Sequence, residues 1–408
     1  MTYQRIKRAV AERLTKGIYH VGAIIALPGV AIIRLLRPII RIRFGFFFAD
    51  RIGHFAFDLE YCLSENALES QRSVRGGDFF FFEGIPANQQ LAKLCKKELW
   101  VNPMVRTLFI ANNWLPGGSE DVLLPARLRN ESRDKVGLLR KTPAQLKIGE
   151  DDNHHALREM EQFGFESEDK FVCLIARDSA YLQGHLPDRD WSYHNFRDCD
   201  VSTYLDAAEQ LSDRGYWVFR MGKDVHQPLE RTIPRVVDYA NSPFRSDLLD
   251  IWLMANCHFA ISSGTGLDSV GDIFRRPILY ANYDVFSLIV TWAKCITVPK
   301  RLIWQETGRE LGIKEYFVHS YAHSQKYQDA GIDVMDMTSE EITVAVLEMV
   351  AWLDGNQRVS DQAAKRQDQF WREYSSQPYF QRYHGCLNPE ARIGEDYLKR
   401  NIGQLLRS

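Results

Sequence analysis

The pattern of apolar and polar residues predicts alternating strands and helices along most of the 408-residue chain. An apolar run at 42–49 predicts a buried strand, helical spacing follows at 55–63, and a phenylalanine-rich run at 78–83 predicts a second strand. Residues 87–99 again have helical spacing and lead into a strand-like stretch at 99–102. Strands that alternate with helices favour parallel pairing, so we expect an α/β fold.

The second half of the chain repeats this pattern more clearly. An apolar strand is predicted at 171–176, followed by a helix that Ser202 caps and Gly215 ends. The remaining predicted elements are strands at 216–221, 258–263 and 277–280 and helices over 246–253 and 267–274, the first of these opening at Ser246. A doubly wound parallel sheet is the simplest arrangement of these elements.

The length of the chain predicts two lobes, because a single hydrophobic core stops growing at about 250–300 residues. Residues 115–165 carry Gly117-Gly118, charge clusters and only short apolar stretches, and we place the region between the lobes there. The expected domains are an N-terminal segment at 1–40, a Rossmann-like domain at 41–165, a second Rossmann-like domain at 166–345 and C-terminal helices at 346–408.

Composition narrows the classes of function. Hydrophobic residues make up 45% and charged residues 25% of the chain, which is typical of a globular protein. A net charge of −2 and the absence of RNA-binding or zinc-finger signatures argue against a nucleic-acid partner. The 7 cysteines are scattered and never form a CxxC pair, so we expect reduced thiols in a reducing compartment.

The N-terminal segment is apolar but interrupted. The run 17–40 contains Pro28, Arg34, Arg37 and Pro38, and further basic residues flank it. We expect a helix that lies in the interface of the cytoplasmic membrane at its inner face, without spanning it. The alternative is a hydrophobic hairpin packed on the globular part.

The strongest local signal for a ligand is a glycine turn between a predicted strand and a predicted helix. It consists of Ser262, Ser263, Gly264, Thr265 and Gly266. Glycines let a backbone approach a ligand, and a helix N-terminus favours phosphate. The third glycine of a dinucleotide fingerprint is replaced by Ser269, which weakens a nicotinamide interpretation. A tight turn without a ligand is the alternative.

Basic residues follow two other predicted strands. Arg177 and Asp178 come directly after the strand at 171–176, and Arg220, Gly222 and Lys223 lie at the end of the next one. In open α/β sheets, ligands bind beyond the carboxyl ends of the strands. Because guanidinium groups match phosphate oxygens, these residues and the glycine turn predict a diphosphate site. For any single arginine, an ion pair with a nearby aspartate is the alternative.

Metal and cofactor signatures are weak. The triplets Asp188-Arg-Asp190 and Asp198-Cys-Asp200 do not follow hydrophobic strands as metal-chelating loops do, and we interpret them as loop or helix-cap residues. The histidines lack zinc-ligand spacing, and no Walker A or GxSxG motif is present. We therefore expect neither a metal nor a cofactor.

His54 is the best candidate for a general base. It lies in the turn after the first predicted strand, and imidazole titrates near neutrality. Asp50 and Asp58 are alternative bases, and a structural histidine bonded to the backbone is the alternative role.

Several of these segments together resemble a bacterial family of glycosyltransferases from surface-polysaccharide gene clusters. The resemblance runs from about Arg43 to the segment at 397–401. It rests on Arg51-Ile-Gly-His54, Ala176-Arg-Asp178, Tyr193-His-Asn-Phe-Arg-Asp198, the stretch 214–222, Ser246-Asp-Leu-Leu-Asp250 and Phe259-Ala-Ile-Ser-Ser-Gly264. A more distant similarity joins the chain to the α1,6-fucosyltransferase and nodulation-fucosyltransferase group of GT-B enzymes.

In that group an arginine after a strand holds the donor diphosphate, and a loop with two serines touches the phosphates and the sugar. Arg177 and Ser262-Ser263 are the matching positions in this chain. Ile175-Ala176 before the arginine and Asp178 after it depart from the group's pattern, so the resemblance does not carry over GDP-fucose as the donor.

The resemblance and the residues together predict a metal-independent, inverting GT-B glycosyltransferase with two Rossmann-like domains facing each other across a cleft. The N-terminal lobe is expected to bind a glycan or lipid-linked acceptor and the C-terminal lobe a nucleoside-diphosphate sugar. Arg177, Arg220 and the glycine turn would neutralise the departing diphosphate. Two other functions stay open: an epimerase-like nucleotide-sugar enzyme, and a non-catalytic GT-B scaffold at the membrane.

Overall fold

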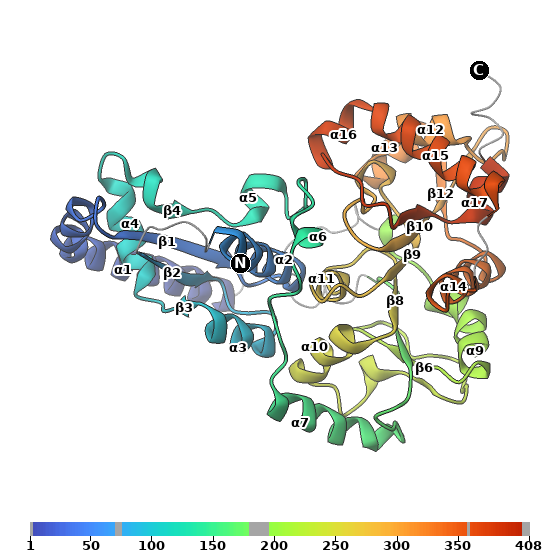
Figure 1. Ribbon diagram of the computed structural model, residues 1–408, viewed down its shortest axis with the longest axis horizontal. Coiled ribbons are helices and arrows are strands. Elements are labelled where there is room, and N and C mark those ends of the chain that lie inside the picture. Colours follow the sequence, from blue (N-terminus) through green and yellow to red (C-terminus); the bar gives the residue numbers. More distant parts are fainter. Residues whose placement is uncertain (1–2, 70–75, 179–195, 357–359, 402–408) are drawn as a thin grey trace. The chain divides into compact units, whose positions relative to one another are not determined.

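The computed structural model describes residues 3–69, 76–178, 196–356 and 360–401 (Figure 1). The chain divides into two compact units, Met1–Ser132 and Arg133–Ser408, called unit 1 and unit 2 below. Each unit is an α/β fold built on a parallel sheet, which confirms the fold class that the alternating pattern predicts.

Unit 1 carries a four-stranded sheet. Its elements are α1 (Tyr3–Leu35), β1 (Arg41–Phe48), α2 (Ile52–Glu69), β2 (Gly76–Glu83), α3 (Gln89–Glu98), β3 (Trp100–Val101), α4 (Val105–Trp114), η1 (Gly118–Asp121), β4 (Val122–Leu123) and α5 (Ala126–Asn130). The strands pair in parallel in the order β3-β2-β1-β4. The register of β1 and β2 sets Arg43 beside Asp78, and their side chains form a two-bonded ion pair at 2.7 and 2.8 Å.

Phenylalanines fill both faces of this sheet. On one face Phe47 stacks on Phe80 with 5.0 Å between ring centroids, and Phe55 of α2 contacts Phe47. On the other face Phe44 and Phe81 form a buried cluster with Val105 of α4. A parallel sheet covered by helices on both faces explains why its strands are nearly continuous apolar runs.

The N-terminal segment forms one long helix, α1, which packs against α4. Ala23 and Val30 are buried against Ala111. Between Ile18 and Leu35 the other side of α1 is exposed, with Ile25 77% and Leu35 80% exposed. The structure therefore confirms an N-terminal apolar helix that is largely exposed. From Gly17 to Leu35 it is long and apolar enough to cross a membrane.

Unit 2 carries a seven-stranded parallel sheet in the order β13-β10-β9-β8-β5-β6-β7 and a separate antiparallel pair, β11-β12. Its first elements are α6 (Leu138–Lys141), α7 (Glu150–Met160), β5 (Phe171–Ile175), η4 (Val201–Tyr204), α9 (Leu205–Asp213), β6 (Trp217–Arg220), β7 (Val236–Val237), α10 (Asp247–Asn256), β8 (Phe259–Ser262), α11 (Asp268–Ile273), β9 (Ile278–Tyr283) and β10 (Cys295–Pro299). They are followed by β11 (Arg301–Trp304), α12 (Ile313–Val318), α13 (Ser324–Asp329), β12 (Ile332–Met335), α14 (Ser339–Leu353), α15 (Asp361–Ser376), α16 (Pro378–Tyr383), β13 (Ala391–Ile393) and α17 (Glu395–Asn401).

The sheet of unit 2 is doubly wound. Figure 1 shows α10 and α11 on one side of it and α9 and α14 on the other. Strand β5 lies inside the sheet between β6 and β8, and all five of its residues are buried. The chain winds outward from β5 in both directions, which brings the carboxyl ends of β5, β6, β8 and β9 to one edge.

Local signals placed two helix ends correctly and one wrongly. The Ser246 hydroxyl accepts the Leu249 amide and caps α10, as predicted. Gly215, with φ +86°, follows the end of α9. The predicted cap at Ser202 is wrong: Asp200 accepts the Ser202 amide and caps the short turn η4, and α9 begins only at Leu205.

The boundary between the units lies earlier than the residue 165 at which the sequence places it. Arg133 belongs to unit 2, because its guanidinium donates to the carbonyls of Tyr383, Leu288 and Ile289. Helix α7 also packs on unit 2, where Asn153 accepts from the Trp252 indole. The C-terminal segment supplies helices and in addition the edge strand β13. Such hydrogen bonds join residues that are far apart in the chain, so the local composition does not show to which unit a segment belongs.

Candidate functional site

The carboxyl edge of the unit 2 sheet brings together most of the polar residues singled out in the sequence. Arg177 follows β5, Ser263 and Gly264 follow β8, and Asp284 follows β9. These strands are neighbours and parallel, so their ends meet at the same edge.

Arg177 is anchored through its backbone at the centre of this edge. Its amide donates to the Ser263 hydroxyl at 2.9 Å, and its carbonyl accepts the Cys199 amide at 3.0 Å. The guanidinium Nε lies 3.5 Å from an oxygen of Asp198, and the side chain is 13% exposed. Burial and the nearby charge of Arg197 lower the pKa of Arg177. The guanidinium thus lies in a partly desolvated place beside another cation.

The second cation, Arg197, was not among the predicted site residues. Its Nε donates to a carboxylate oxygen of Asp284, and its Nη2 donates to the Gly264 carbonyl at 3.3 Å. The side chain is 28% exposed, whereas Asp284 is buried and its other oxygen accepts the Val285 amide. Arg197 lies inside the Tyr193–Asp198 motif that carried the family resemblance, so the sequence contained a signal for it.

The segment Arg197–Asp200 crosses the edge and is fixed at several strand ends. Besides the bond from Cys199 to Arg177, the buried ammonium of Lys300, directly after β10, donates to the Asp198 carbonyl. Lys300 also donates to Asp336 at 2.6 Å, and Asp336 accepts the Asp200 amide at 3.0 Å. These bonds hold both Arg197 and Asp198 at the edge of the sheet.

The glycine turn is built around a buried carboxylate. Asp268, the first residue of α11, accepts the Ser262 hydroxyl at 2.9 Å and the Thr265 amide at 2.7 Å. The Gly264 amide donates to the Ser262 hydroxyl at 3.1 Å. Burial raises the pKa of Asp268 to about 7.

The contact of this turn with a donor stays a prediction, and its internal hydrogen bonds limit how it could be made. The amides of Gly264 and Thr265 are used inside the turn, which is what a phosphate-binding loop would avoid. Gly264 has φ +87°, and a Cβ there would lie 3.3 Å from the Tyr283 ring. The turn therefore requires glycine at this position, both for its left-handed backbone and for its packing against Tyr283. Gly266 is exposed at the tip. Ser262 and Ser263 position the turn and Arg177, respectively.

Arg220 has a different place from the one expected. It is 1% exposed, and its guanidinium donates to Asp238 at 3.0 Å and to the Gln227 carbonyl at 3.2 Å. Asp178 lies 3.9 Å from the same guanidinium and accepts the His226 amide at 3.0 Å. Both residues thus hold the loop after β6 in position, and Arg220 does not present its charge at the surface.

Two further predicted residues belong to that loop. A Cβ at Gly222 would lie 2.7 Å from Val225, so close packing within the loop requires the glycine. Lys223 is exposed. Its contact with a donor remains a prediction.

In unit 1, His54 lies in the first turn of α2. Its Nδ1 is 3.0 Å from the hydroxyl of Ser132, and that hydroxyl donates to Asp58 at 2.9 Å. The Arg127 amide donates to the same Asp58 oxygen at 2.9 Å. His54 is partly buried and Asp58 fully buried. The predicted base therefore sits in a chain of side-chain hydrogen bonds.

The acidic triplets show no metal site in the described part of the chain. Asp188 and Asp190 lie outside the described residues. Asp198 is beside Arg177, and Asp200 caps η4, in line with the loop or cap interpretation. Among the described residues there is no group of three His, Cys, Asp or Glu side chains that could hold a metal ion.

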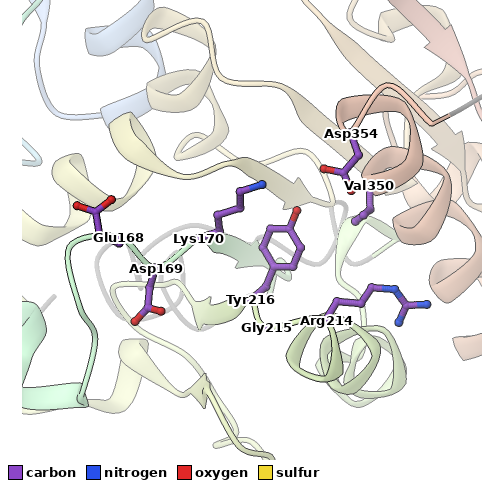
Figure 2. A pocket seen from close by; sticks show the side chains of 8 residues that line it. All are labelled: Glu168, Asp169, Lys170, Arg214, Gly215, Tyr216, Val350 and Asp354. Carbon is purple, nitrogen blue, oxygen red and sulfur yellow. The ribbon is translucent and has the colours of Figure 1, made fainter.

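A cavity of about 560 Å³ opens at the opposite, amino edge of the same sheet (Figure 2). It is lined by Glu168, Asp169, Lys170, Arg214, Gly215, Tyr216, Val350 and Asp354. Its polar groups are partly engaged, because Asp169 accepts from Trp217 and Tyr216 bonds to His258. None of the predicted site residues lies there.

No family model and no curated protein matches this chain. Among solved structures, it is similar to the glycosyl transferase family 9 protein of Veillonella parvula, with 10% identity and a TM-score of 0.42 over 76% of this chain and 97% of that one. The ADP-heptose LPS heptosyltransferase II of E. coli is 16% identical at a TM-score of 0.37, over 76% and 100% of the two chains. The UDP-GlcNAc 2-epimerase of Neisseria meningitidis, bound to UDP-GlcNAc, is 10% identical at a TM-score of 0.29, over 90% and 100%.

Proposed function

We propose that this chain is a GT-B glycosyltransferase that moves a sugar from a nucleoside-diphosphate donor to a glycan or lipid-linked acceptor in surface-polysaccharide synthesis. The observation that carries the proposal is the pair Arg177 and Arg197 at the carboxyl edge of the unit 2 sheet. Two partly exposed guanidiniums that lie within electrostatic reach of each other suit a ligand with two adjacent negative charges.

The proposed reaction inverts the anomeric carbon and needs no metal. The acceptor hydroxyl attacks that carbon, its proton passes to His54, and the bond from the carbon to the diphosphate oxygen breaks. The electron pair of that bond leaves with the nucleoside diphosphate. Arg177 and Arg197 stabilise the growing negative charge, which is the role a divalent cation has in other transferases.

We also propose that α1 holds the protein at the inner face of the cytoplasmic membrane. Two of the basic residues that favoured this from the sequence form hydrogen bonds within unit 1: Arg34 donates to Asn112 and Pro116, and Arg37 donates to Asp121. The attraction that we propose comes from the exposed apolar side chains of α1 between Ile18 and Leu35. A helix that is packed on α4 through such polar contacts is unsuited to crossing a bilayer, so we place it along the surface.

A thermal-shift experiment tests the donor site. UDP, GDP, ADP, CMP and dTDP are each added to the full chain with EDTA present, and at least one should raise the melting temperature, since a ligand at 100 times its Kd stabilises by about 2.7 kcal/mol. The same nucleotide should not stabilise Arg177→Ala.

The outcomes separate the alternatives. Stabilisation only with added manganese or magnesium would contradict metal independence. Turnover of the matching sugar nucleotide without any acceptor, giving an isomeric sugar, would favour the epimerase-like function. No shift with any nucleotide would favour the scaffold.

A further inference from the structure

The hydrogen bonds around His54 determine which ring nitrogen carries the proton. Asp58 is fully buried, and one of its oxygens accepts both the Ser132 hydroxyl and the Arg127 amide. Since the only hydrogen of the Ser132 hydroxyl is used on Asp58, that hydroxyl can only accept from His54. The imidazole must therefore carry its proton on Nδ1.

The other ring nitrogen is left as the basic one. With the proton on Nδ1, the lone pair of neutral imidazole lies on Nε2. Among the described residues, nothing bonds to Nε2 of His54. This arrangement is what a general base needs, namely a fixed ring with one nitrogen held by the protein and the other open.

The geometry points to Ser132 and Asp58 as positioning residues that orient His54 and keep the lone pair on Nε2 for the acceptor hydroxyl. The inference rests on the proposed function, because it assigns the residues that prepare the base of that reaction. Asp58 acts through Ser132 and touches no substrate. His54 and Asp58 are one helical turn apart on α2, and Ser132 bridges them from the end of unit 1.

The backbone at Ser132, which bridges His54 and Asp58, has an uncommon conformation. Ser132 has φ +54° and the preceding Glu131 has φ +61°, a left-handed conformation that is uncommon for residues other than glycine. Such a conformation persists only where surrounding contacts enforce it, and it often marks functional positions. Here it turns the Ser132 hydroxyl toward α2.

The electrostatic setting keeps the imidazole neutral. Burial and the charges of Arg127 and Arg51 lower the pKa of His54 to about 4, while Asp50 opposes them. Burial raises the pKa of Asp58 to about 6, opposed by its bonds to Ser132 and Arg127 and by the charge of Arg129. The second oxygen of Asp58 has no hydrogen-bond partner in the described part of the chain, so protonation there leaves the bonded oxygen as an acceptor. The bridge is therefore retained whether Asp58 is charged or neutral.

The same bond directions exclude a serine nucleophile. In such a site the histidine accepts the serine proton and the acid holds the histidine. Here the serine lies between the two and donates to the acid, so His54 does not activate Ser132.

The test combines NMR of the free protein with kinetics. The full chain, labelled with ¹⁵N-histidine, should show His54 with its proton on Nδ1 at pH 7, identified by its loss in His54→Gln. Glycine adopts the left-handed backbone of residue 132 without strain, so Ser132→Gly removes only the hydroxyl between His54 and Asp58. This variant should shift the imidazole proton of His54 from Nδ1 toward Nε2. Asp58→Ala should also shift the proton toward Nε2, because the Ser132 hydroxyl loses its acceptor and can then donate to His54. Asp58→Asn should keep the proton on Nδ1, because its side-chain amide oxygen still accepts from the Ser132 hydroxyl.

Kinetics then distinguish a positioning role from a structural one. With UDP-, GDP-, ADP- and dTDP-sugars as probes, Ser132→Gly should lower kcat about ten- to a hundredfold with KM unchanged, because a general base supplies roughly 10²–10⁴-fold. Asp58→Asn should retain most of the activity. Glu131→Gln is the matched control, a neighbouring carboxylate-to-amide change that touches neither partner, and it should alter neither readout.

A proton on Nε2 of the wild-type protein, or an unchanged tautomer in Ser132→Gly, would overturn the inference whatever the kinetics show. A changed tautomer with unchanged kcat would also overturn it. If no sugar nucleotide is turned over by the wild type, the proposed function fails, and the NMR result alone decides whether the hydrogen-bond chain orients His54.

Discussion

Two pairs of arginines in this chain differ in their surroundings: Arg34 and Arg37 at the C-terminal end of α1 in unit 1, and Arg177 and Arg197 at the carboxyl edge of the unit 2 sheet. Arg34 and Arg37 bond to Asn112, to Asp121 and to backbone carbonyls, so they fasten α1 to its own unit. At the unit 2 edge, Arg177 lies near another cation and its pKa is lowered. The sequence predicted that the first region contacts the membrane interface and that the second binds a diphosphate.

The difference shows that an arginine's function depends on whether the fold supplies it with sufficient partners. A guanidinium with several acceptors stabilises the structure that contains them, and its loss leaves buried acceptors unpaired. Arg177 and Arg197 each have a carboxylate partner, but they also lie close enough to repel each other, and a bound anion relieves that repulsion. On this ground the unit 2 edge is the better ligand site.

The largest expected effect is at Arg177. Replacing it with alanine should lower the turnover of a sugar nucleotide at least roughly a hundredfold, because removing a preorganised donor from the developing charge costs about 3–4 kcal/mol. Arg177→Lys keeps the charge but loses the planar fork, so it should be impaired as well. Steady-state rates and thermal unfolding of each variant check the effect on turnover and the integrity of the fold.

Arg37→Ala is the matched control from the other region. It should lower the melting temperature, since the buried Asp121 loses its closest partner and keeps only Arg34 at 3.9 Å, and it should leave nucleotide binding unchanged. Normal turnover in Arg177→Ala, or lost nucleotide binding in Arg37→Ala, would break the contrast between the two regions.

A smaller effect, on the pH dependence of stability, is expected for Asp268 in the turn at the unit 2 edge. Its folded pKa of about 7 lies above its ordinary value of 3.8, so between these pH values the folded state holds a proton that the unfolded state has released. The wild type should therefore lose stability as pH rises from 5 to 8. Asp268→Asn stays neutral and should lose roughly 1–3 kcal/mol less over that range.

Chemical denaturation of both proteins at pH 5, 6, 7 and 8 measures this difference. Parallel stability curves would mean that Asp268 is ionised throughout, and the turn would then carry a negative charge next to the proposed diphosphate site.

The smallest effect concerns the apolar face of α1. Ile25→Ser and Ile32→Ser change exposed side chains and leave the packing of Ala23 and Val30 on α4 intact. Each should weaken binding to vesicles of phosphatidylethanolamine and phosphatidylglycerol by roughly tenfold, since burying such a side chain is worth about 1.5–3 kcal/mol.

Flotation of the full chain with these vesicles provides the measurement. Val318→Ser, at an exposed apolar position of α12, is the control and should bind as the wild type does. Equal binding of all four proteins would mean that α1 does not contact the membrane through this face.

Sequence reasoning located the central strands of both sheets, the cap at Ser246 and the position of Arg177, because each depends on near neighbours in the chain. It did not find the two-residue strands β4 and β7, although it predicted a strand at 99–102, where the equally short β3 lies. It grouped Arg220 with Arg177, since both end apolar strands, although only one of them is partly exposed.

What the sequence by itself determined is therefore local: the period of the apolar residues, the helix caps, and which residue types follow each strand. The tertiary structure decided which polar groups meet. Arg197 and Asp284 are separated by 87 positions, and His54 and Ser132 by 78, so no local pattern connects them. Such pairs form because a closed core leaves each buried polar group to find a partner wherever the fold brings one within reach, and that choice assigns each arginine and histidine its role.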